Sequence, residues 1–523
     1  MIVAVIFWGT SCDAEDKPES RIATDVTSLT FEQEGGSLQL AVRSNTDWTI
    51  DKSGCAWVTV NTLAGSGNQT ITVTAPKNTE TYRTGQIVLR AGDKSKEVNI
   101  AQYSDEQPSS DRLSDVSGKQ IDILGWWGIR AGSAAAIHQD MADAGFTVNM
   151  AVDLVGELAS VFADGTERFF SLMDATAAVN MKTMVSDFVF DYLSGTDIDR
   201  LKSHPALFGY FIHDEPRQSD FPEMTARVNK VQALDSAHPC YINLAPCLYC
   251  ADATPDSWMP ELSCGPAFPE PSPCVRFVQK FIRDVPVPIL SFDMYPIWQN
   301  TVTRKRELQV RWYYTLEVMS SEARKAGKPL WAFALSTAHK NFEFPYPLPT
   351  LNDIRLQVYS DLAYGAQCIQ YFTYAHVAND GWQAPTGPNG EKQETWYIIK
   401  EVNEEIKALS PVFLNATVEW IAHTGEIPAG CTALDVSKLP SVFHSLNIDG
   451  GKGALVSLMK KGNDHFLVIV NHDINEVITV QASGTPDLRR VKKDGSVVIA
   501  DNRIHTVMPG DVLIYFWKQD GSL

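Results

Sequence analysis

Residues 207–216 read LFGYFIHDEP, and this stretch decides how the rest of the chain is interpreted. Its first half is a short apolar run without polar alternation, which is typical of a strand buried on both faces in a parallel sheet. The run ends abruptly at Asp214 and Glu215. Because burying two acids is costly, we expect the strand to end at a solvated cleft. The alternative is a plain helix start, in which Asp214 caps the helix after Pro216 and Glu215 is solvated.

Strand-like and helix-like segments alternate throughout residues 118–412. The predicted strands are Gln120–Trp126, Thr147–Val152, Lys182–Phe188, Leu207–His213, Cys240–Leu244, Ile289–Met294, Pro329–Leu335 and Cys368–Tyr374. The predicted helices are Ser133–Ala144, Glu167–Asn180, Thr196–Ser203, Pro222–Leu234, Cys274–Arg283, Thr303–Ala326, Leu351–Gly365 and Trp396–Leu409. Eight strand–helix units in a segment of this length predict a (β/α)8 or TIM barrel. A doubly wound open sheet is the alternative, but no glycine-rich phosphate loop follows any strand.

All-β patterns flank this barrel on both sides. Residues 25–103 contain short alternating strands between Gly, Asn, Asp and Ser turns, and predict a small β-sandwich. Residues 104–117 form a polar linker without apolar periodicity. Residues 413–523 again alternate between turns, and predict an antiparallel β-sandwich that packs on the barrel and has no chemistry of its own. The chain is therefore expected to be multidomain.

The first twelve residues, MIVAVIFWGTSC, are predicted to be a targeting segment, because the apolar run is too short to span a bilayer. Small residues lead into Cys12, and a polar, acidic tether over residues 13–24 follows. This resembles a bacterial lipoprotein signal, which implies that Cys12 is lipidated. The resemblance implies an exported lipoprotein on the outer membrane and cell surface.

Four of the nine cysteines fall in one Pro-rich segment with the spacing C-x2-C-x13-C-x9-C, namely Cys247, Cys250, Cys264 and Cys274. Disulfides, a zinc site and free thiols all remain open, and export favours disulfides. The other cysteines of the folded region occupy apolar contexts and are expected to be inert core residues: Cys55, Cys240, Cys368 and Cys431.

The net charge of −19 argues against nucleic acid or an anionic membrane surface as the main partner. We expect no cofactor and a monomeric protein. The chain has 13 tryptophans, enough to supply the aromatic rings of a sugar-binding cleft, although most tryptophans in proteins pack in the core.

The carboxyl ends of the predicted barrel strands should converge on one cleft. The side chains expected there are Trp126, Trp127, Asp153, Asp187, His213, Asp214, Glu215, Asn243, Asp293, Tyr295, Trp298, Ser336, His339, Tyr374 and His376. The loop over residues 375–395 adds Asn379, Asp380, Trp382, Glu391 and Glu394. Acids, amides and exposed rings in one concave place suit a polyhydroxylated substrate, because rings stack on sugar faces and carboxylates bind hydroxyl groups. We therefore predict a carbohydrate substrate.

Several pieces of the N-terminal segment match a known module. They are NTDWTI (45–50), AWVTVNTLAGSGNQTITVTAPKN (56–78), YRTG (82–85) and VNIAQ (98–102). This resembles the BACON domain of Bacteroidetes surface proteins. The resemblance implies either carbohydrate binding or a spacer that lifts an enzyme off the membrane. Trp48 and Trp57 are interpreted as core residues rather than a sugar platform.

The barrel has a resemblance of its own. Glu215 before Pro216, SFDMYPI (291–297), QVYSDLAYGAQCIQYFTY (357–374) and VNEEIKALSPVF (402–413) resemble the large clan of retaining TIM-barrel glycoside hydrolases and related glycosidases of gut Bacteroidetes. The resemblance implies that Glu215 is the general acid/base, with a pKa raised by burial or by Asp214.

The chain departs from that clan at the seventh strand, where a nucleophilic Glu is expected. Residues 329–340 (PLWAFALSTAHK) contain no carboxylate, and Glu343 lies farther along the loop. Asp293 or an acid from residues 375–395 is then the candidate second catalytic group. It would act as a nucleophile at about 5 Å from Glu215 or as the base of an inverting mechanism at about 6.5–9.5 Å.

Together these patterns predict a surface-tethered glycoside hydrolase that acts on a plant or host polysaccharide or oligosaccharide, with Glu215 and Asp293 as catalytic residues. The alternative is a non-catalytic cell-surface glycan-binding protein on a degenerate barrel. A zinc hydrolase using Cys247 and Cys250 is disfavoured, because no His lies near them. A serine hydrolase is disfavoured because no G-x-S-x-G occurs, which leaves Ser336 near His339 as a coincidence.

Overall fold

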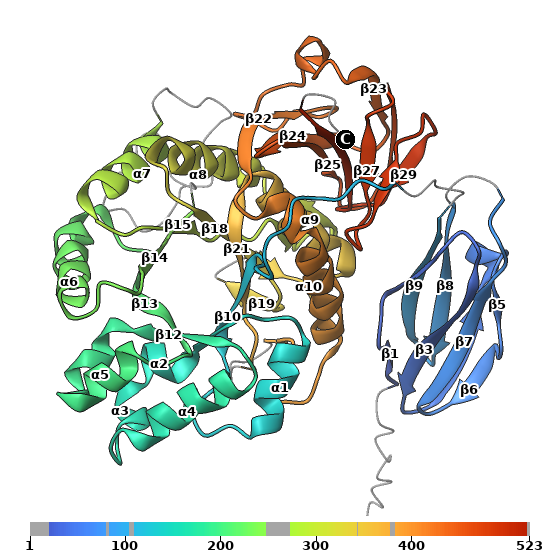
Figure 1. Cartoon of the computed structure of the whole chain (residues 1–523). Coiled ribbons are helices and arrows are strands. Elements are labelled where there is room, and N and C mark those ends of the chain that lie inside the picture. The colour runs from blue at the N-terminus through green and yellow to red at the C-terminus, as the bar shows by residue number, and fades with distance from the viewer. Residues whose placement is uncertain are drawn as a thin grey trace, which may run out of the picture. The chain divides into compact units, whose positions relative to one another are not determined.

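The computed structural model describes residues 20–79, 83–103, 109–246, 272–341, 344–376 and 382–519. The chain divides into two compact units, Met1–Ser104 and Asp105–Leu523. Within the described residues, the first contains two β-sheets, and the second contains a closed parallel barrel, two larger antiparallel sheets and two antiparallel strand pairs (Figure 1). Among the described helices, none combines the length and the apolar character needed to cross a bilayer.

The first unit is a sandwich of two sheets around one apolar core. One sheet has the order β1 (Ile22–Thr24), β3 (Gly36–Ser44), β7 (Gln69–Ala75), β5 (Thr59–Val60). The other has the order β2 (Ser28–Phe31), β9 (Lys94–Gln102), β8 (Arg83–Ala91), β4 (Asp47–Asp51), β6 (Ala64–Ser66). The predicted sandwich is confirmed. Trp48 lies in its core and donates from Nε1 to the Gly67 carbonyl at 2.9 Å, while Trp57 is half-buried beneath the Arg83 guanidinium.

Eight parallel strands close the barrel of the second unit, which confirms the predicted fold class. In chain order they are β10 (Asp122–Gly128), β11 (Val148–Ala151), β12 (Lys182–Ser186), β13 (Leu207–Asp214), β14 (Cys240–Leu244), β15 (Leu290–Phe292), β18 (Leu330–Leu335) and β21 (Ala366–Phe372). The last strand pairs with the first in the register Asp122↔Cys368 to Trp126↔Phe372. Every strand predicted from the apolar runs is present, because both faces of each are covered.

Helices surround the barrel. The main ones are α1 (Ala135–Asp143), α4 (Glu167–Ala178), α5 (Thr196–Lys202), α6 (Phe221–Leu234), α7 (Pro273–Asp284), α8 (Trp312–Ala326), α9 (Leu351–Ala363) and α10 (Glu394–Phe413). Short elements follow strand ends, namely α2 (Val152–Gly156), α3 (Leu158–Val161) and the 3-10 helices η2 (Asp187–Asp191) and η3 (Gln218–Asp220). Two antiparallel pairs also occur, β16 (Ile297–Gln299) with β17 (Arg306–Leu308) and β19 (His339–Asn341) with β20 (Phe344–Tyr346).

The predicted helix Thr303–Ala326 is wrong in its first third. Residues 306–308 form β17, and the helix begins only at Trp312. The reason is local, because the Asn300 side-chain oxygen accepts hydrogen bonds from the backbone N–H groups of Val302 and Thr303, both at 2.9 Å. Asn in this role stabilises a turn and stops the chain from continuing as a helix.

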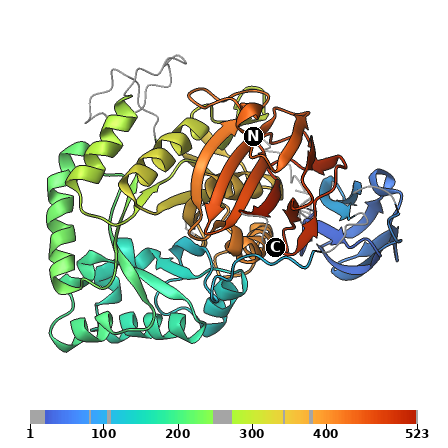
Figure 2. The same ribbon diagram turned by 45° about the horizontal axis from the view of Figure 1, so that its top comes forward.

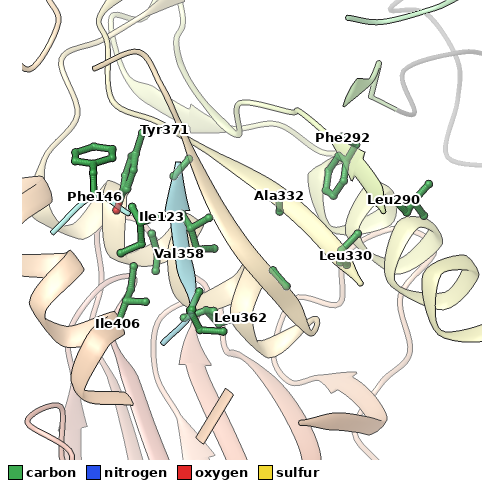
Figure 3. Close-up of a cluster of buried hydrophobic side chains, with 14 of the residues drawn as sticks. Ile123, Phe146, Leu290, Phe292, Leu330, Ala332, Val358, Leu362, Tyr371 and Ile406 are labelled. Carbon is green, nitrogen blue, oxygen red and sulfur yellow. The ribbon is translucent and has the colours of Figure 1, made fainter. Parts of the chain in front are cut away.

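The barrel has one core inside and another between its strands and the helices. Figure 3 shows part of the outer core, where α9 and α10 contribute Val358, Leu362 and Ile406, and the strands contribute side chains such as Ile123 and Tyr371. All of these side chains are fully buried. Because the strands are apolar on both faces, polar groups of the barrel are restricted to a few interior positions and to the strand ends.

The C-terminal sheets pack on this assembly. The larger has the order β22 (Thr417–His423), β24 (Ala454–Lys461), β25 (Asp464–Asn471), β30 (Val512–Lys518), β27 (Arg489–Val491), β28 (Val497–Ile499). The smaller has β23 (Phe443–Asp449), β26 (Ile478–Gly484) and β29 (His505–Val507). The larger sheet lies against α9 (Figure 2), and its apolar face belongs to the same core as the barrel helices. Ser457 bonds the Ala363 carbonyl at 2.7 Å across this contact.

Candidate active site

A cavity of about 230 Å³ opens among the carboxyl ends of the barrel strands. Its walls are formed by Trp126, Asp214, Glu215, Asn243, Asp293, Tyr295, Phe333, His339, Lys340, Phe372 and Trp382. They come from β10, β13, β14, β15, β18, β19 and β21 and from residues just beyond these strands. Three carboxyl groups therefore share one ring-lined cavity with an amide and an ammonium group.

The carboxyl groups of Glu215 and Asp293 line the same cavity, and each affects the pKa of the other. Burial, followed by the nearby Asp214 carboxyl, raises the pKa of Glu215 to about 7. Burial and the charge of Glu215 raise the pKa of Asp293 well above its usual range. Asp214 is exposed to the cavity. Even so, desolvation by the residues around it and the charge of Asp293 raise its pKa to about 7. Three groups this close cannot all ionise, so the cluster retains a proton at neutral pH.

The backbone at Glu215 is held in an unusual conformation. Its φ is +47°, in the left-handed region that costs a non-glycine residue roughly 1 kcal/mol or more. Its N–H donates to the Asn243 carbonyl at 2.8 Å, so the neighbouring strand β14 fixes this turn. The strand therefore ends with Glu215 directed into the cavity wall rather than continuing its alternation.

The Asn243 side chain connects two of the three acids. Its amide nitrogen donates to Asp293 Oδ1 at 2.9 Å and to Asp214 Oδ1 at 3.1 Å, which uses both of its N–H groups. Its oxygen accepts from the Ser291 hydroxyl at 3.0 Å, so the orientation of the amide is determined. Donors to a carboxylate favour its charged form, and Asn243 accordingly lowers the pKa of both acids against the effect of burial.

A buried chain of hydrogen bonds supports Asn243 from inside the barrel. Gln370 donates from Nε2 to Ser291 Oγ at 2.9 Å. The Gln370 carbonyl oxygen accepts from the Tyr241 hydroxyl at 2.6 Å and from Trp126 Nε1 at 3.4 Å. We call Trp126, Tyr241, Gln370 and Ser291 the interior chain. Because each of its polar groups is paired, it holds the amide of Asn243 in one orientation.

Aromatic side chains make up most of the remaining wall. Tyr295 lowers the pKa of Asp293 and stacks on Phe372, with ring centroids 5.5 Å apart. His339 lies between Tyr346 (4.8 Å) and Trp382 (4.9 Å). Its Nδ1 donates to the Thr337 carbonyl at 2.9 Å, and burial lowers its pKa, so the ring is neutral at pH 7. Lys340 carries the only ammonium group among the residues that line the cavity.

The structure brings eight of the predicted site residues together at this cavity, namely Trp126, Asp214, Glu215, Asn243, Asp293, Tyr295, His339 and Trp382. Trp127 does not line the cavity, but stacks on Trp382 with centroids 5.5 Å apart and an interplanar angle of 15°. Trp126 is 4% exposed and forms part of the barrel core, so it presents little surface as a platform.

Other predicted site residues lie away from this cavity. Asp153 is buried and accepts from the Ala131 N–H at 2.9 Å. Asp187 forms a two-point ion pair with Arg227 at 2.6 and 2.9 Å. Tyr374 is buried and its hydroxyl accepts from Trp396 Nε1 at 3.3 Å. His213 is half-buried on β13, and Trp298 is half-buried on β16.

Sequence reasoning missed Ser291, Tyr241, Gln370, Phe333, Phe372 and Lys340. A signal existed for several of them, because alternate residues of a strand face the same side. Tyr241 precedes Asn243 by two positions, and Ser291 precedes Asp293 by two. Gln370 and Phe372 have the same spacing on β21.

Several predicted residues lie outside the described residues, namely Cys12, Cys247, Cys250, Cys264, Glu343, Asn379 and Asp380. Cys274, in α7, is disulfide-bonded. Cys55, Cys240, Cys368 and Cys431 are free thiols, and the first three are buried. Glu391 accepts from the Asn389 N–H at 2.9 Å, and Glu394 begins α10. Within the described part of the chain, no three His, Cys, Asp or Glu side chains are grouped to hold a metal ion.

Residues 46–103 match the BACON family model, described as "Putative binding domain, N-terminal", which confirms the resemblance seen in the sequence. No curated protein matches the chain.

Similar solved structures include a β-galactosidase from the psychrophilic Marinomonas ef1, with 9% identity and a TM-score of 0.45 over 76% of this chain and 100% of that one. A GH30 endoxylanase from Clostridium papyrosolvens has 9% identity and a TM-score of 0.35 over 79% and 98%. A GH5 xyloglucanase from Bacteroides ovatus has 11% identity and a TM-score of 0.31 over 73% and 99%.

Proposed function

We propose that the protein is a glycoside hydrolase in which Glu215 is the general acid/base and Asp293 is the nucleophile. The observation that carries this proposal is the placement of both carboxyl groups in one ring-lined cavity at the carboxyl end of the barrel, where each affects the pKa of the other. Hydrolysis of a glycosidic bond needs one protonated and one ionised carboxyl group on opposite sides of that bond. A pair that shares one proton provides both states at neutral pH.

The hydrogen-bond donors indicate where the proton resides. Asp293 receives a hydrogen bond from Asn243 Nδ2 at 2.9 Å, and Tyr295 also lowers its pKa. Both groups stabilise negative charge on Asp293. Glu215 is half-buried, and burial and the nearby Asp214 carboxyl favour its neutral form. Although burial and the charge of Glu215 raise the pKa of Asp293, the Asn243 hydrogen bond is made to Asp293, so we assign the proton to Glu215 and the charge to Asp293.

The mutual influence of the two acids favours a retaining mechanism. Inverting hydrolases keep their carboxyl groups about 6.5–9.5 Å apart to leave room for a water molecule, whereas retaining ones keep them about 5–5.5 Å apart. Each of the two carboxyl groups affects the pKa of the other, which favours the shorter separation of a retaining hydrolase.

The reaction then follows from these roles. Glu215 gives its proton to the glycosidic oxygen as the bond to the leaving group breaks, and an Asp293 oxygen bonds to the anomeric carbon. Glu215, now ionised, removes a proton from water while that water displaces Asp293. The sugar is released with its original anomeric configuration, and both acids return to their starting states.

Hydrolysis assays over plant and host glycans and aryl glycosides test the proposal, with Glu215→Gln and Asp293→Asn beside the unmodified protein. Each variant should lose about 10²-fold or more in kcat, the scale of removing an acid/base group. For an activated aryl glycoside, azide should restore turnover of Glu215→Ala with retained configuration and of Asp293→Ala with inverted configuration. A product of inverted anomeric configuration from the unmodified protein would contradict the nucleophile assignment.

A non-catalytic glycan-binding protein is the second candidate, and the carboxylate-free end of β18 favours it. Under this reading the cavity binds sugar but breaks no bond. The same experiment separates the two functions, because binding without hydrolysis by the unmodified protein, and equal binding by Glu215→Gln, would support this candidate.

We also propose that the chain is a lipoprotein of the outer membrane, anchored through Cys12 and displayed at the cell surface. This rests on the sequence MIVAVIFWGTSC and the polar tether after it. Expression in a bacterial host with labelled palmitate should label the native chain and leave Cys12→Ala unlabelled. Release of the native chain in soluble form without label would contradict the anchor.

A further inference from the structure

Two aromatic rings outside the cavity are unusually exposed for their size. Phe188 is 46% exposed and Tyr192 is 44% exposed. Phe188 lies in η2, which follows the carboxyl end of β12, and Tyr192 is the residue directly after η2. In a closed parallel barrel all carboxyl ends lie on one side, so both rings share that side with the cavity.

Each ring is covered on one face by a flat group. The Arg227 guanidinium carbon lies 4.3 Å from the centroid of Phe188. Phe162 stacks on Tyr192 with centroids 4.8 Å apart and an interplanar angle of 11°. An aromatic ring covered on one face and open on the other has roughly half of its surface accessible, as both rings do here. We call Phe188 and Tyr192 the aromatic ledge.

The ledge is anchored at both ends. Arg227, which supports Phe188, forms its two-point ion pair with Asp187 at the start of η2 and also bonds the Ile212 carbonyl of β13. Lys230 pairs with Asp191 at the end of η2, at 3.0 Å. Both cations belong to α6. The rings are therefore held before any ligand arrives, and little side-chain entropy is lost on binding.

We propose that the aromatic ledge is a second glycan-binding site, which stacks the distal units of an oligosaccharide whose other end occupies the cavity. This rests on the proposed hydrolase function of the cavity. Aromatic faces carry partial negative charge and sugar C–H faces partial positive charge, so an open, fixed ring suits a sugar face. The charged groups beside the rings are paired with one another, Arg227 with Asp187 and Lys230 with Asp191, so the ligand class is a neutral glycan chain.

The dimensions fit such a chain. The cavity of about 230 Å³ is smaller than most ligand sites, which run to roughly 300–1,000 Å³, so it accommodates a sugar unit rather than a chain. Positions 188 and 192 are separated by about 8 Å along a 3-10 axis, which suits neighbouring units of one glycan. Arg227, which covers Phe188, also bonds the Ile212 carbonyl, and Ile212 lies three residues, or about 10 Å, along β13 from Glu215.

The test compares hydrolysis of a series of oligosaccharides of increasing length for the unmodified protein, Phe188→Ala and Tyr192→Ala. For the unmodified protein, kcat/KM should rise with length, and each variant should lose about tenfold on the longest member, the scale of one aromatic contact. Tyr192→Phe keeps the ring and should retain the length dependence. Ile504→Ala is the matched control, because it shortens an exposed side chain next to β29 in the C-terminal sheets.

A second measurement separates failure of the ledge from failure of the hydrolase function. Calorimetric titration of the longest oligosaccharide into Glu215→Gln should give about tenfold weaker binding when Phe188→Ala is added. If the unmodified protein hydrolyses no glycan but this binding difference is observed, the hydrolase function is refuted and the ledge stands. If hydrolysis occurs with no length dependence, or the two ledge variants match Ile504→Ala on the longest substrate, the ledge is refuted.

Discussion

Replacing Asn243 by Ala should shift the pH dependence of the reaction as well as its rate. The amide of Asn243 donates one hydrogen bond to Asp293 and one to Asp214. Asn243 is 1% exposed, and alanine offers no donor in its place. The variant therefore removes the largest effect that stabilises charge on Asp293 and leaves the smaller one of Tyr295.

The magnitude follows from these bonds. A hydrogen bond to a charged group contributes about 1.5–3 kcal/mol, and about 1.4 kcal/mol corresponds to a tenfold change. Loss of the Asn243 donor should make the state in which Asp293 is ionised and Glu215 is protonated about 10- to 100-fold less favourable. Because the donor favours the charged form, its removal raises the pKa of Asp293 further. Both limbs of the bell-shaped kcat/KM profile should move to higher pH, the acid limb by about one unit or more.

The assay is the pH dependence of kcat/KM on an aryl glycoside for the native protein, Asn243→Ala and Ser291→Ala. Ser291→Ala removes the bond to the amide oxygen but leaves both donors to the acids, so its profile should stay near that of the native protein. Carbon-13 NMR of the labelled carboxyl groups would follow the same titrations without substrate. Equal loss of activity at every pH, with unshifted limbs and carboxyl titrations, would refute the role of Asn243 in stabilising Asp293.

Three further outcomes are expected. Asp214→Asn removes a repulsive neighbour of Glu215 and should move the alkaline limb of kcat/KM to lower pH; an unmoved limb would contradict the coupling. Burial and His472 lower the pKa of His423 to about 3, below its usual 6.5, so the unfolded chain takes up the proton first. Stability should therefore fall as pH drops from 6.5 toward 3, less steeply in His423→Gln, as thermal unfolding midpoints would show. Arg355→Met leaves the buried Glu405 without its main partner and should cost about 3–5 kcal/mol in denaturant unfolding, whereas an unchanged midpoint would contradict that role.

The sequence predicted the barrel because its strands are apolar on both faces, and such runs are distinctive when they alternate with helix-period segments. LFGYFIHDEP became β13, and the other seven runs became strands within a few residues of their predicted bounds. The error at Thr303–Ala326 has a different origin. There the helical periodicity of the later residues was extended back to Thr303, into a segment that begins with a turn stabilised by the Asn300 side chain.

The site was only partly predictable. Strand ends converge by topology, so Glu215, Asn243 and Asp293 could be placed on one rim. The same rule could not exclude Asp187 from the site. An acid at a strand end can equally form an ion pair, as Asp187 does with Arg227. The roles of Gln370 and Ser291 depend on which polar groups meet inside the barrel. The two-residue spacing along a strand indicates on which face these side chains lie, but not which groups they hydrogen-bond to.

The position of the second acid follows from the strand order. The end of β18 is occupied by hydroxyl contacts to β21, since Ser336 donates to the Thr373 carbonyl at 2.8 Å and Thr337 pairs with the Thr373 hydroxyl at 3.0 Å. Glu215 and Asp293 instead directly follow β13 and β15, and Asn243 lies on β14 between these two strands. Neighbouring strands are about 4.8 Å apart, so the backbones that carry the two acids are about 10 Å apart. With a glutamate side chain on one side, this distance leaves room for the shorter side chain of an aspartate on the other. Asp293→Glu, one methylene longer, should therefore crowd Glu215 and lower kcat despite keeping the carboxyl group.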